Sequence, residues 1–270
     1  MIHAIINMKF GNRLLLLLVL IGLNFISMPA AQSQNLELGL TAGGAGYIGD
    51  LNPEQPFKLS GEAAGGFVKL NLDPYWSLGL HYTYGRVAAD DAKSSQADFQ
   101  QRNLKFYTPI HEVAAIVDFN FLEYFAGGGR KRFTPYVYAG FGGFIFNPKR
   151  RFDDEVRYLR LYRTEDQYFP YRNYSFTIPY GAGVKFKLKS NFSLMANIGY
   201  RSTFTDYIDD VSGVYKRITD GNTIREYLAN PALDNRSFGA QRGDSRRSDT
   251  YLFSQVGISY TFLCKDCLTF

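Results

Sequence analysis

The sequence has few of the residues on which most catalytic and metal sites depend. Its 270 residues include three histidines and two cysteines. Two cysteines alone cannot form a closed four-ligand zinc site. His3 lies in an N-terminal segment that we expect to be removed. A catalytic site needs a base, a nucleophile and an orienting group close together. His81 has no evident carboxylate partner in the sequence. His111 lies on the opposite face of its strand from its neighbour Glu112. We therefore expect no enzymatic activity and no cofactor.

Long apolar runs and clustered charge are also missing. Mean hydropathy is −0.20. After the N-terminal segment no run approaches the roughly 18 apolar residues of a membrane-spanning helix, which excludes a helical membrane bundle. The net charge is +5, and the basic residues are interleaved with acidic ones, which argues against nucleic-acid binding. Phe, Tyr and Gly are abundant, at 23, 20 and 26 residues, which favours strands and turns and excludes a disordered chain.

The N-terminal segment has the organisation of a secretory signal peptide. Lys9 and Arg13 precede the apolar run 14–26, and small residues follow it. The run is too short to span a bilayer comfortably. No cysteine follows it, so a lipoprotein is not expected. We predict a cleaved signal peptide over residues 1–33 and an exported chain that begins at Gln34.

Several segments place an apolar side chain at every second residue, the period of a β-strand with one apolar face. Residues 192–204, 176–188 and 76–84 follow this rule most clearly. Their apolar faces end in aromatic residues, as membrane-interface girdles do, and their opposite faces carry glycine and charge that a dry core could not hold unpaired. Eight strands are expected, at residues 35–47, 57–72, 75–87, 103–121, 132–147, 174–188, 191–205 and 250–262.

The connections between these strands alternate in length. Outer-membrane barrels have short periplasmic turns, long external loops and both termini in the periplasm. The predicted fold class is therefore all-β: an eight-stranded antiparallel transmembrane β-barrel of the outer-membrane type, formed by residues 34–262, with a periplasmic C-terminal extension over residues 263–270. The connections expected outside the cell are mostly longer and more charged than the others, and comprise residues 48–56, 88–102, 148–173 and 206–249.

Charged residues on the polar faces of the strands should point into the barrel. Eight strands enclose an interior only wide enough for side chains, so we expect no diffusive pore. Opposite charges can pair across this interior and specify its geometry. The residues expected to do so are Glu37, Lys69, Glu112, Asp118, Lys185, Lys187 and Arg201.

The last predicted strand carries a further pattern. Gln255, Gly257, Tyr260 and Phe262 place a polar residue, a glycine and two aromatic residues at defined spacing near the end of the barrel. This pattern resembles the signal by which the barrel-assembly machinery recognises outer-membrane proteins. An ordinary amphipathic strand is the alternative, which the signal peptide and the number of strands disfavour.

Three aspartates, Asp206, Asp209 and Asp210, cluster after the seventh predicted strand. Several carboxylates together could bind Ca²⁺. Pairing with basic side chains is the alternative that we favour. The basic residues considered are Arg201, Lys216 and Arg217.

Five stretches of the chain share motifs with one family. They include Gly-Gly-Ala-Gly-Tyr-Ile-Gly-Asp-Leu-Asn-Pro at 43–53 and Thr-Asp-Tyr-Ile-Asp-Asp-Val-Ser within 200–212, and the others are 133–148, 161–167 and 178–185. These stretches resemble the PorG-like barrels of the type IX secretion system over nearly the whole mature chain. The sequence departs from the family at Asp166, where a glycine usually follows Thr-Glu.

The resemblance implies a role and a partner. PorG-like proteins are taken to contact the periplasmic ring of the secretion machine, which is built from a lipoprotein and its soluble partner. A contact surface on this chain must then be periplasmic. A basic turn and the C-terminal extension supply the candidate contact residues, Arg130, Lys131, Arg132, Cys264 and Cys267. The alternative for the basic turn is a flexible, soluble connection that binds no partner. The alternative for the two cysteines is a local disulfide, because the compartment is oxidising. Both alternatives stay open.

The expected location is the bacterial outer membrane, with lipid and lipopolysaccharide as partners. The predicted loop 149–172 is rich in Arg and Tyr. Its arginines could contact lipopolysaccharide phosphates, although a folded, solvated loop explains the composition equally well. If the external loops carry the function, the protein is a general small barrel with a structural, adhesive or envelope-stabilising role.

Overall fold

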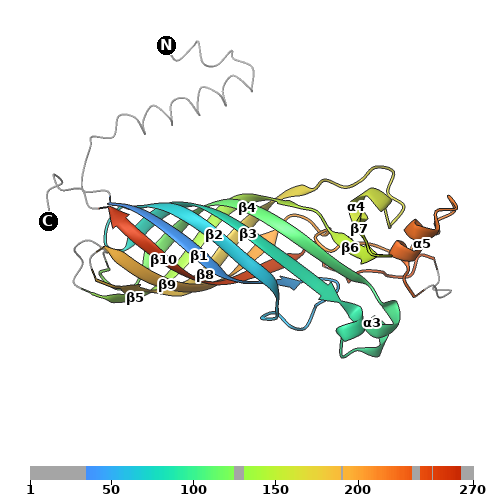
Figure 1. Ribbon diagram of the computed structural model, residues 1–270, viewed down its shortest axis with the longest axis horizontal. Helices are drawn as coiled ribbons and strands as arrows, with labels where there is room; N and C mark the ends of the chain where they lie inside the picture. Colours follow the sequence, from blue (N-terminus) through green and yellow to red (C-terminus); the bar gives the residue numbers. More distant parts are fainter. Residues whose placement is uncertain (1–34, 125–130, 190, 233–237, 245, 263–270) are drawn as a thin grey trace, which may run out of the picture. The chain divides into compact units, whose positions relative to one another are not determined.

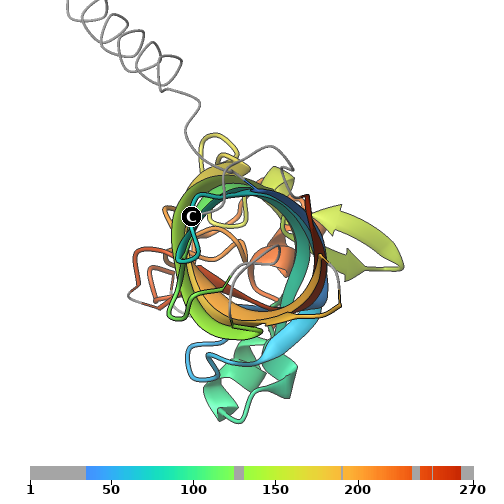
Figure 2. The ribbon, with the colours of Figure 1, turned by 90° about the vertical axis from the view of Figure 1, so that its left-hand side faces the viewer.

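Eight long strands form a closed antiparallel barrel, in which every strand pairs with a neighbour on each side (Figure 1 and Figure 2). The structure is a computed structural model that describes residues 35–124, 131–189, 191–232, 238–244 and 246–262. The predicted signal peptide, residues 1–33, lies outside the described residues. The barrel strands are β1 (Asn35–Ile48), β2 (Leu59–Asn71), β3 (Trp76–Asp90), β4 (Lys105–Asn120), β5 (Phe133–Phe146), β8 (Tyr174–Lys187), β9 (Phe192–Thr203) and β10 (Thr250–Phe262).

Two pairings close the ring. β1 pairs with β10, with Leu36 opposite Phe262, and β3 pairs with β4 from Trp76 to Asp90. The predicted fold class, an all-β eight-stranded antiparallel barrel, is confirmed. Every predicted strand boundary lies within three residues of the observed one, and the largest difference is at the end of β3, which continues to residue 90 instead of 87.

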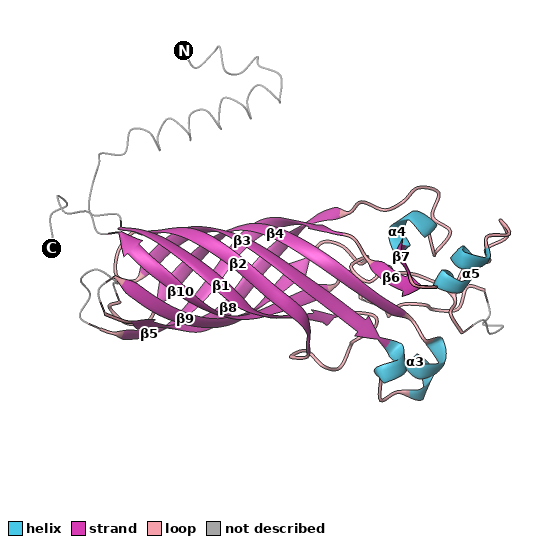
Figure 3. Ribbon diagram, viewed as in Figure 1, coloured by secondary structure: helices cyan, strands magenta, loops and turns pink. Residues whose placement is uncertain are grey.

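The two ends of the barrel differ. At one end of the barrel, β1 begins, β10 ends, and the chain forms the β2–β3, β4–β5 and β8–β9 connections; we call it the turn end. The opposite end, the loop end, carries connections 49–58, 91–104, 147–173 and 204–249. All the described helices lie at the loop end (Figure 3), and none of them is long and apolar enough to cross a membrane. The elements within these connections are η1 (Asp91–Lys93), α3 (Ala97–Arg102), β6 (Lys149–Phe152), β7 (Glu155–Tyr158), α4 (Leu159–Tyr162) and α5 (Thr223–Ala229).

Large apolar side chains cover the outer face of the barrel. On β3, for example, Leu78, Leu80 and Tyr82 are 45%, 58% and 48% exposed, and the residues between them point inward. Aromatic rings meet on this face at the turn end, where the ring centres of Trp76 and Phe119 lie 4.8 Å apart. Water-exposed surfaces rarely carry contiguous apolar patches beyond a few hundred Å². The outer face therefore has the chemistry of a surface in contact with lipid.

The inner face changes character along the barrel. Charged and polar residues fill it toward the turn end, and aromatic rings, including Phe144, Phe146, Tyr251 and Phe253, form a buried cluster toward the loop end. Glycine provides the space for one of these rings, because a Cβ atom at Gly85 would lie 2.3 Å from the ring of Phe253. The interior seen as open between the ribbons of Figure 2 is thus occupied by side chains.

Candidate functional site

The first cluster of charged residues inside the barrel is centred on Asp118. The side-chain nitrogens of Lys69 and Lys185 lie 2.6 and 2.9 Å from Asp118 Oδ2. Lys185 also donates a hydrogen bond to Asn120 Oδ1 at 3.0 Å. These side chains are at most 3% exposed. The structure therefore brings together three of the residues that the sequence predicted to pair in the interior.

A second cluster lies further toward the loop end. Arg201 Nε lies 3.5 Å from Glu112 Oε2, and the hydroxyl of Tyr251 donates to the same oxygen at 2.6 Å. The guanidinium of Arg201 also packs 4.5 Å from the ring centre of Phe253, a cation–π contact. This cluster joins β4, β9 and β10 across the interior.

The two other predicted interior charges lie nearer the turn end. Glu37 is buried and accepts a hydrogen bond from Asn71 Nδ2 at 3.0 Å. Lys187 is half-buried on the same face of β8 as Lys185. A cavity of about 20 Å³ remains between the two clusters, lined by residues that include Asp118 and Arg201. That volume holds about one water molecule.

The two histidines of the barrel lie on opposite faces of its wall. His81 faces the interior, stacks on Phe67 with a ring-centre distance of 5.1 Å, and has a buried Nε2 without a hydrogen-bond partner. His111 lies on the outer face with Nδ1 2.9 Å from the hydroxyl oxygen of Tyr82. Within the described part of the chain, neither ring hydrogen bonds to a carboxylate that could orient it, as a catalytic base requires.

The four connections at the loop end fold together, and we call their described residues the cap. Arg102, the last residue of α3, forms a bidentate ion pair with Asp91, at 2.7 and 2.9 Å. Its guanidinium also donates to the backbone oxygens of Asp50 at 3.0 Å and Arg242 at 2.9 Å. Because Arg102 is buried, this one side chain joins three of the four connections.

A second buried arginine joins the two longest connections. Arg242 donates from Nη1 to Glu165 Oε1 at 3.0 Å and to the backbone oxygen of Asp210 at 2.7 Å. The hydroxyls of Thr164 and Tyr171 each donate to the Asp210 carboxylate at 2.6 Å. Burial raises the pKa of Asp210 to about 6, although Arg242 and both hydroxyls act in the opposite direction. The cap is therefore a folded unit held by buried polar contacts.

The predicted pairing of the three aspartates after β9 with Arg201, Lys216 and Arg217 is wrong. Arg201 lies on β9 with its side chain in the barrel interior, and the aspartates lie beyond the end of that strand. Lys216 and Arg217 are exposed, and no ion pair among the described residues joins them to an aspartate. Asp210 lies beside Arg242 instead.

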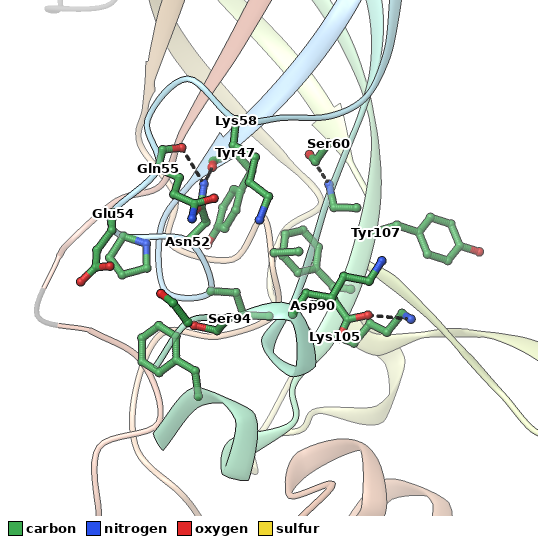
Figure 4. Close-up of a pocket in the computed structure, with 18 of the residues that line it drawn as sticks. Tyr47, Asn52, Glu54, Gln55, Lys58, Ser60, Asp90, Ser94, Lys105 and Tyr107 are labelled. Carbon is green, nitrogen blue, oxygen red and sulfur yellow. Dashed lines mark hydrogen bonds and ion pairs between the residues drawn. The ribbon is translucent and has the colours of Figure 1, made fainter. Parts of the chain in front are cut away.

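A surface pocket of about 370 Å³ opens at the loop end and is lined partly by residues of the cap (Figure 4). It lies between the β1–β2 connection, the loop-end parts of β3 and β4, and η1. Its wall carries both signs of charge, with Lys58, Lys105, Glu54 and Asp90, and Lys105 Nζ lies 2.9 Å from Asp90 Oδ2. The described lining includes no histidine or cysteine, and its other polar residues include Ser60, Ser94 and Ser95.

The residues predicted to contact a partner fall largely outside the described part of the chain. Arg130, Cys264 and Cys267 lie outside it. Lys131 and Arg132 are described, and both are exposed at the turn end next to β5.

The residues of the predicted assembly signal all lie on β10. Gln255 is buried and donates from Nε2 to Thr41 Oγ1 at 3.1 Å. A Cβ atom at Gly257 would lie 2.6 Å from the backbone oxygen of Leu40. The rings of Tyr260 and Phe262 contact each other, with centres 4.8 Å apart, and Phe262 is 47% exposed on the outer face.

Sequence reasoning missed the arginines that hold the cap. Arg102 and Arg242 were not singled out, because their partners lie up to 140 residues away along the chain. The one available signal was their position inside connections that are rich in acidic residues, which does not identify a partner.

Comparison with known proteins gives a family and several similar folds. No curated protein sequence matches the chain. Similar solved structures include the N-terminal β-barrel domain of Pseudomonas aeruginosa OprF, with 14% identity, 86% of this chain and 100% of that chain covered, and a TM-score of 0.38. Neisserial surface protein A (NspA) has 10% identity, coverage of 84% and 97%, and a TM-score of 0.42. OprG from Pseudomonas aeruginosa has 10% identity, coverage of 87% and 98%, and a TM-score of 0.39.

The family match covers most of the chain. Residues 13–270 match a family described as a domain of unknown function, DUF6089. The match spans all eight barrel strands and the cap. The chain belongs to the DUF6089 family.

Proposed function

We propose that the protein is a non-enzymatic β-barrel of the bacterial outer membrane. The observation that carries this proposal is an apolar outer face around a closed interior that is filled with side chains and is polar toward the turn end. Charged side chains such as Lys69 and Asp118 are tolerated inside because they are paired. The turn end, with the start of β1 and the end of β10, then faces the periplasm, and the cap faces outward, as in other barrels of this membrane.

We further propose that the protein is a structural component of the type IX secretion system. The five stretches that resemble PorG-like barrels support this role, and so does the filled interior, which leaves the ends of the barrel as the places where function can lie. The barrel then joins the outer membrane to the periplasmic ring lipoprotein and its soluble partner.

The contact surface that fits this role is the turn end. Lys131 and Arg132 are exposed there, beside Arg130. The extension that carries Cys264 and Cys267 follows β10, whose last residue, Phe262, pairs with Leu36 at the same end. Basic residues suit an acidic ring surface, and a cysteine suits a covalent bond to a ring subunit in an oxidising compartment.

Deletion of residues 263–270 and the double reversal Arg130→Glu/Lys131→Glu test this surface. Each change should lower the amount of ring that co-purifies with the barrel from cell envelopes by about tenfold, which corresponds to about 1.4 kcal/mol of binding free energy. If Cys264 bonds to the ring, non-reducing gels should also show a higher-mass band that Cys264→Ser removes. Secretion of cargo into the medium should fall in parallel.

The matched control is the double reversal Lys58→Glu/Lys93→Glu, which changes the charge equally on exposed residues of the loop end. It should leave ring recovery unchanged. Heat-modifiable migration on gels establishes that each variant barrel has assembled. Undiminished ring recovery and secretion in both turn-end variants would exclude the turn end as the contact surface.

A second candidate function has support from the cap. Tyr168 and Phe169 are 84% and 73% exposed on a connection that buried contacts to Arg242 hold in place. A rigid cap with exposed aromatic rings suits an adhesive or envelope-stabilising role, or contact with lipopolysaccharide. Tyr168→Ser/Phe169→Ser should then abolish binding to cells or lipopolysaccharide, whereas deletion of residues 263–270 should have no effect.

A further inference from the structure

Three carboxylates from separate parts of the chain meet at the base of the cap. Asp50 follows β1, Asp206 follows β9, and Asp249 precedes β10. One oxygen of each lies within 4.8 Å of an oxygen of the other two. Asp50 and Asp249 are 2% and 1% exposed, and Asp206 is half-buried. Sequence reasoning placed Asp206 in an acidic cluster but missed Asp50 and Asp249.

The Asp50 side chain has an unused oxygen in this group. Its Oδ1 accepts a hydrogen bond from the backbone N–H of Asp244 at 2.5 Å. Its Oδ2 is buried and has no hydrogen-bond partner. A buried carboxylate oxygen without a partner is costly, since it has lost its hydration without replacement. An oxygen in this state is available to a cation.

A fourth carboxylate increases the negative charge. Tyr47 donates its hydroxyl hydrogen to Asp209 Oδ2 at 2.5 Å, and the hydroxyl oxygen lies 3.1 Å from Asp249 Oδ1. Asp209 also accepts a hydrogen bond from the backbone N–H of Val211. The four aspartates therefore concentrate up to four negative charges in a region that is mostly buried.

The two buried arginines that hold the cap together pair with other carboxylates. Arg102 pairs with Asp91, and Arg242 pairs with Glu165. Among the described residues, no lysine or arginine forms an ion pair with Asp50, Asp206 or Asp249. A cation from solution would supply the positive charge that the described residues do not give these three carboxylates.

We propose that Asp50, Asp206 and Asp249 bind one divalent cation, with Ca²⁺ the best match. Ca²⁺ binds six to eight oxygen ligands at about 2.3–2.6 Å in flexible geometry, which suits carboxylates from separate loops completed by water and backbone oxygens. Tyr47, which hydrogen bonds to Asp209, also contacts Asp249 and holds its side chain in place. The cation joins the β1–β2 connection to both ends of the β9–β10 connection, and so fastens the cap to the barrel rim.

The full-length barrel, refolded in detergent without lipopolysaccharide and treated with a chelator, is the protein to test. Isothermal titration with CaCl₂ should show one Ca²⁺ per chain, and Ca²⁺ should slow proteolysis of the β9–β10 connection. Asp206→Asn and Asp50→Asn should each weaken Ca²⁺ binding by about tenfold or more and reduce the protection. Asp206 is half-buried, so Asp206→Asn tests the site even if Asp50→Asn does not fold.

Asp98→Asn is the matched control, since it removes one exposed carboxylate from α3 at the same end of the barrel. It should bind Ca²⁺ as the unchanged protein does. The proposal is overturned if the chelator-treated barrel binds no Ca²⁺. It is equally overturned if folded Asp206→Asn binds Ca²⁺ with unchanged affinity, because the cation would then lie elsewhere.

Discussion

Replacing Asp118 by Asn should lower the free energy of unfolding of the barrel by about 3–5 kcal/mol, the cost of removing one partner from a buried ion pair. Lys69 and Lys185 both contact Asp118 Oδ2, so the change leaves two ammonium groups close together in the interior. The adjoining cavity of about 20 Å³ holds about one water molecule and cannot hydrate them. Trp76, the single tryptophan, reports the transition by its fluorescence during urea unfolding in lipid bilayers.

Asp90→Asn is the matched control for this experiment. Asp90 also pairs with a lysine, Lys105, at 2.9 Å, but the lysine side chain is 56% exposed. An exposed pair of this kind contributes roughly 0–1 kcal/mol. Adding Lys185→Met to Asp118→Asn should restore part of the lost stability, because it removes one of the two unpaired charges. Equal effects of Asp118→Asn and Asp90→Asn would contradict the assignment of Asp118 as the centre of the interior network.

The second large effect is expected in the cap. Arg242→Met should destabilise the folded cap by about 3–5 kcal/mol, since it leaves Glu165 and Asp210 buried without their cation. The barrel itself should stay assembled, because the strands do not depend on this contact. Limited proteolysis of the variant in micelles should cut the connections at the loop end far faster than in the unchanged protein.

The control is Arg246→Met, in the same connection. Arg246 pairs with Asp244 at 3.3 Å, and both side chains are partly exposed, at 42% and 27%. Its loss should change the rate of proteolysis little. If Arg242→Met left the cap as resistant as Arg246→Met does, the cap would not depend on the buried arginine.

The barrel was predictable from the sequence because one local rule determines it. Along each strand, successive residues face lipid and the interior in turn, so the position of a residue in this alternation determines its environment. Leu78 and Leu80 therefore marked the outer face of β3, and Asp118 and Lys185 marked inner faces, before any pairing was known. The alternation does not identify the residue with which a charged side chain pairs. Lys69 and Asp118 are 49 residues apart, and their contact depends on strand register and on packing across the interior.

The cap was not predictable in the same way, because its elements are short and its contacts are distant. The helix α4 has four residues and α5 has seven, too few to be stable without tertiary contacts. Tyr47 and Asp209 are 162 residues apart. The wrong pairing of Arg201 with the aspartates came from proximity in sequence: the strand directs Arg201 into the interior, and the aspartates follow where the strand has ended.

If the outer face of the barrel lies in lipid, spin labels attached to it should be shielded from water-soluble reagents. The native cysteines are first removed by Cys264→Ser/Cys267→Ser. Single cysteines then replace Leu80, Val137 and Leu194, which are exposed on the outer face, and are labelled in bilayers. A cysteine at Ser95, in the cap, is the water-exposed reference. Collisions with oxygen should exceed collisions with a water-soluble nickel chelate at the three outer-face positions, and Ser95 should show the reverse. Nickel accessibility at the outer-face positions equal to that at Ser95 would contradict contact of this face with lipid.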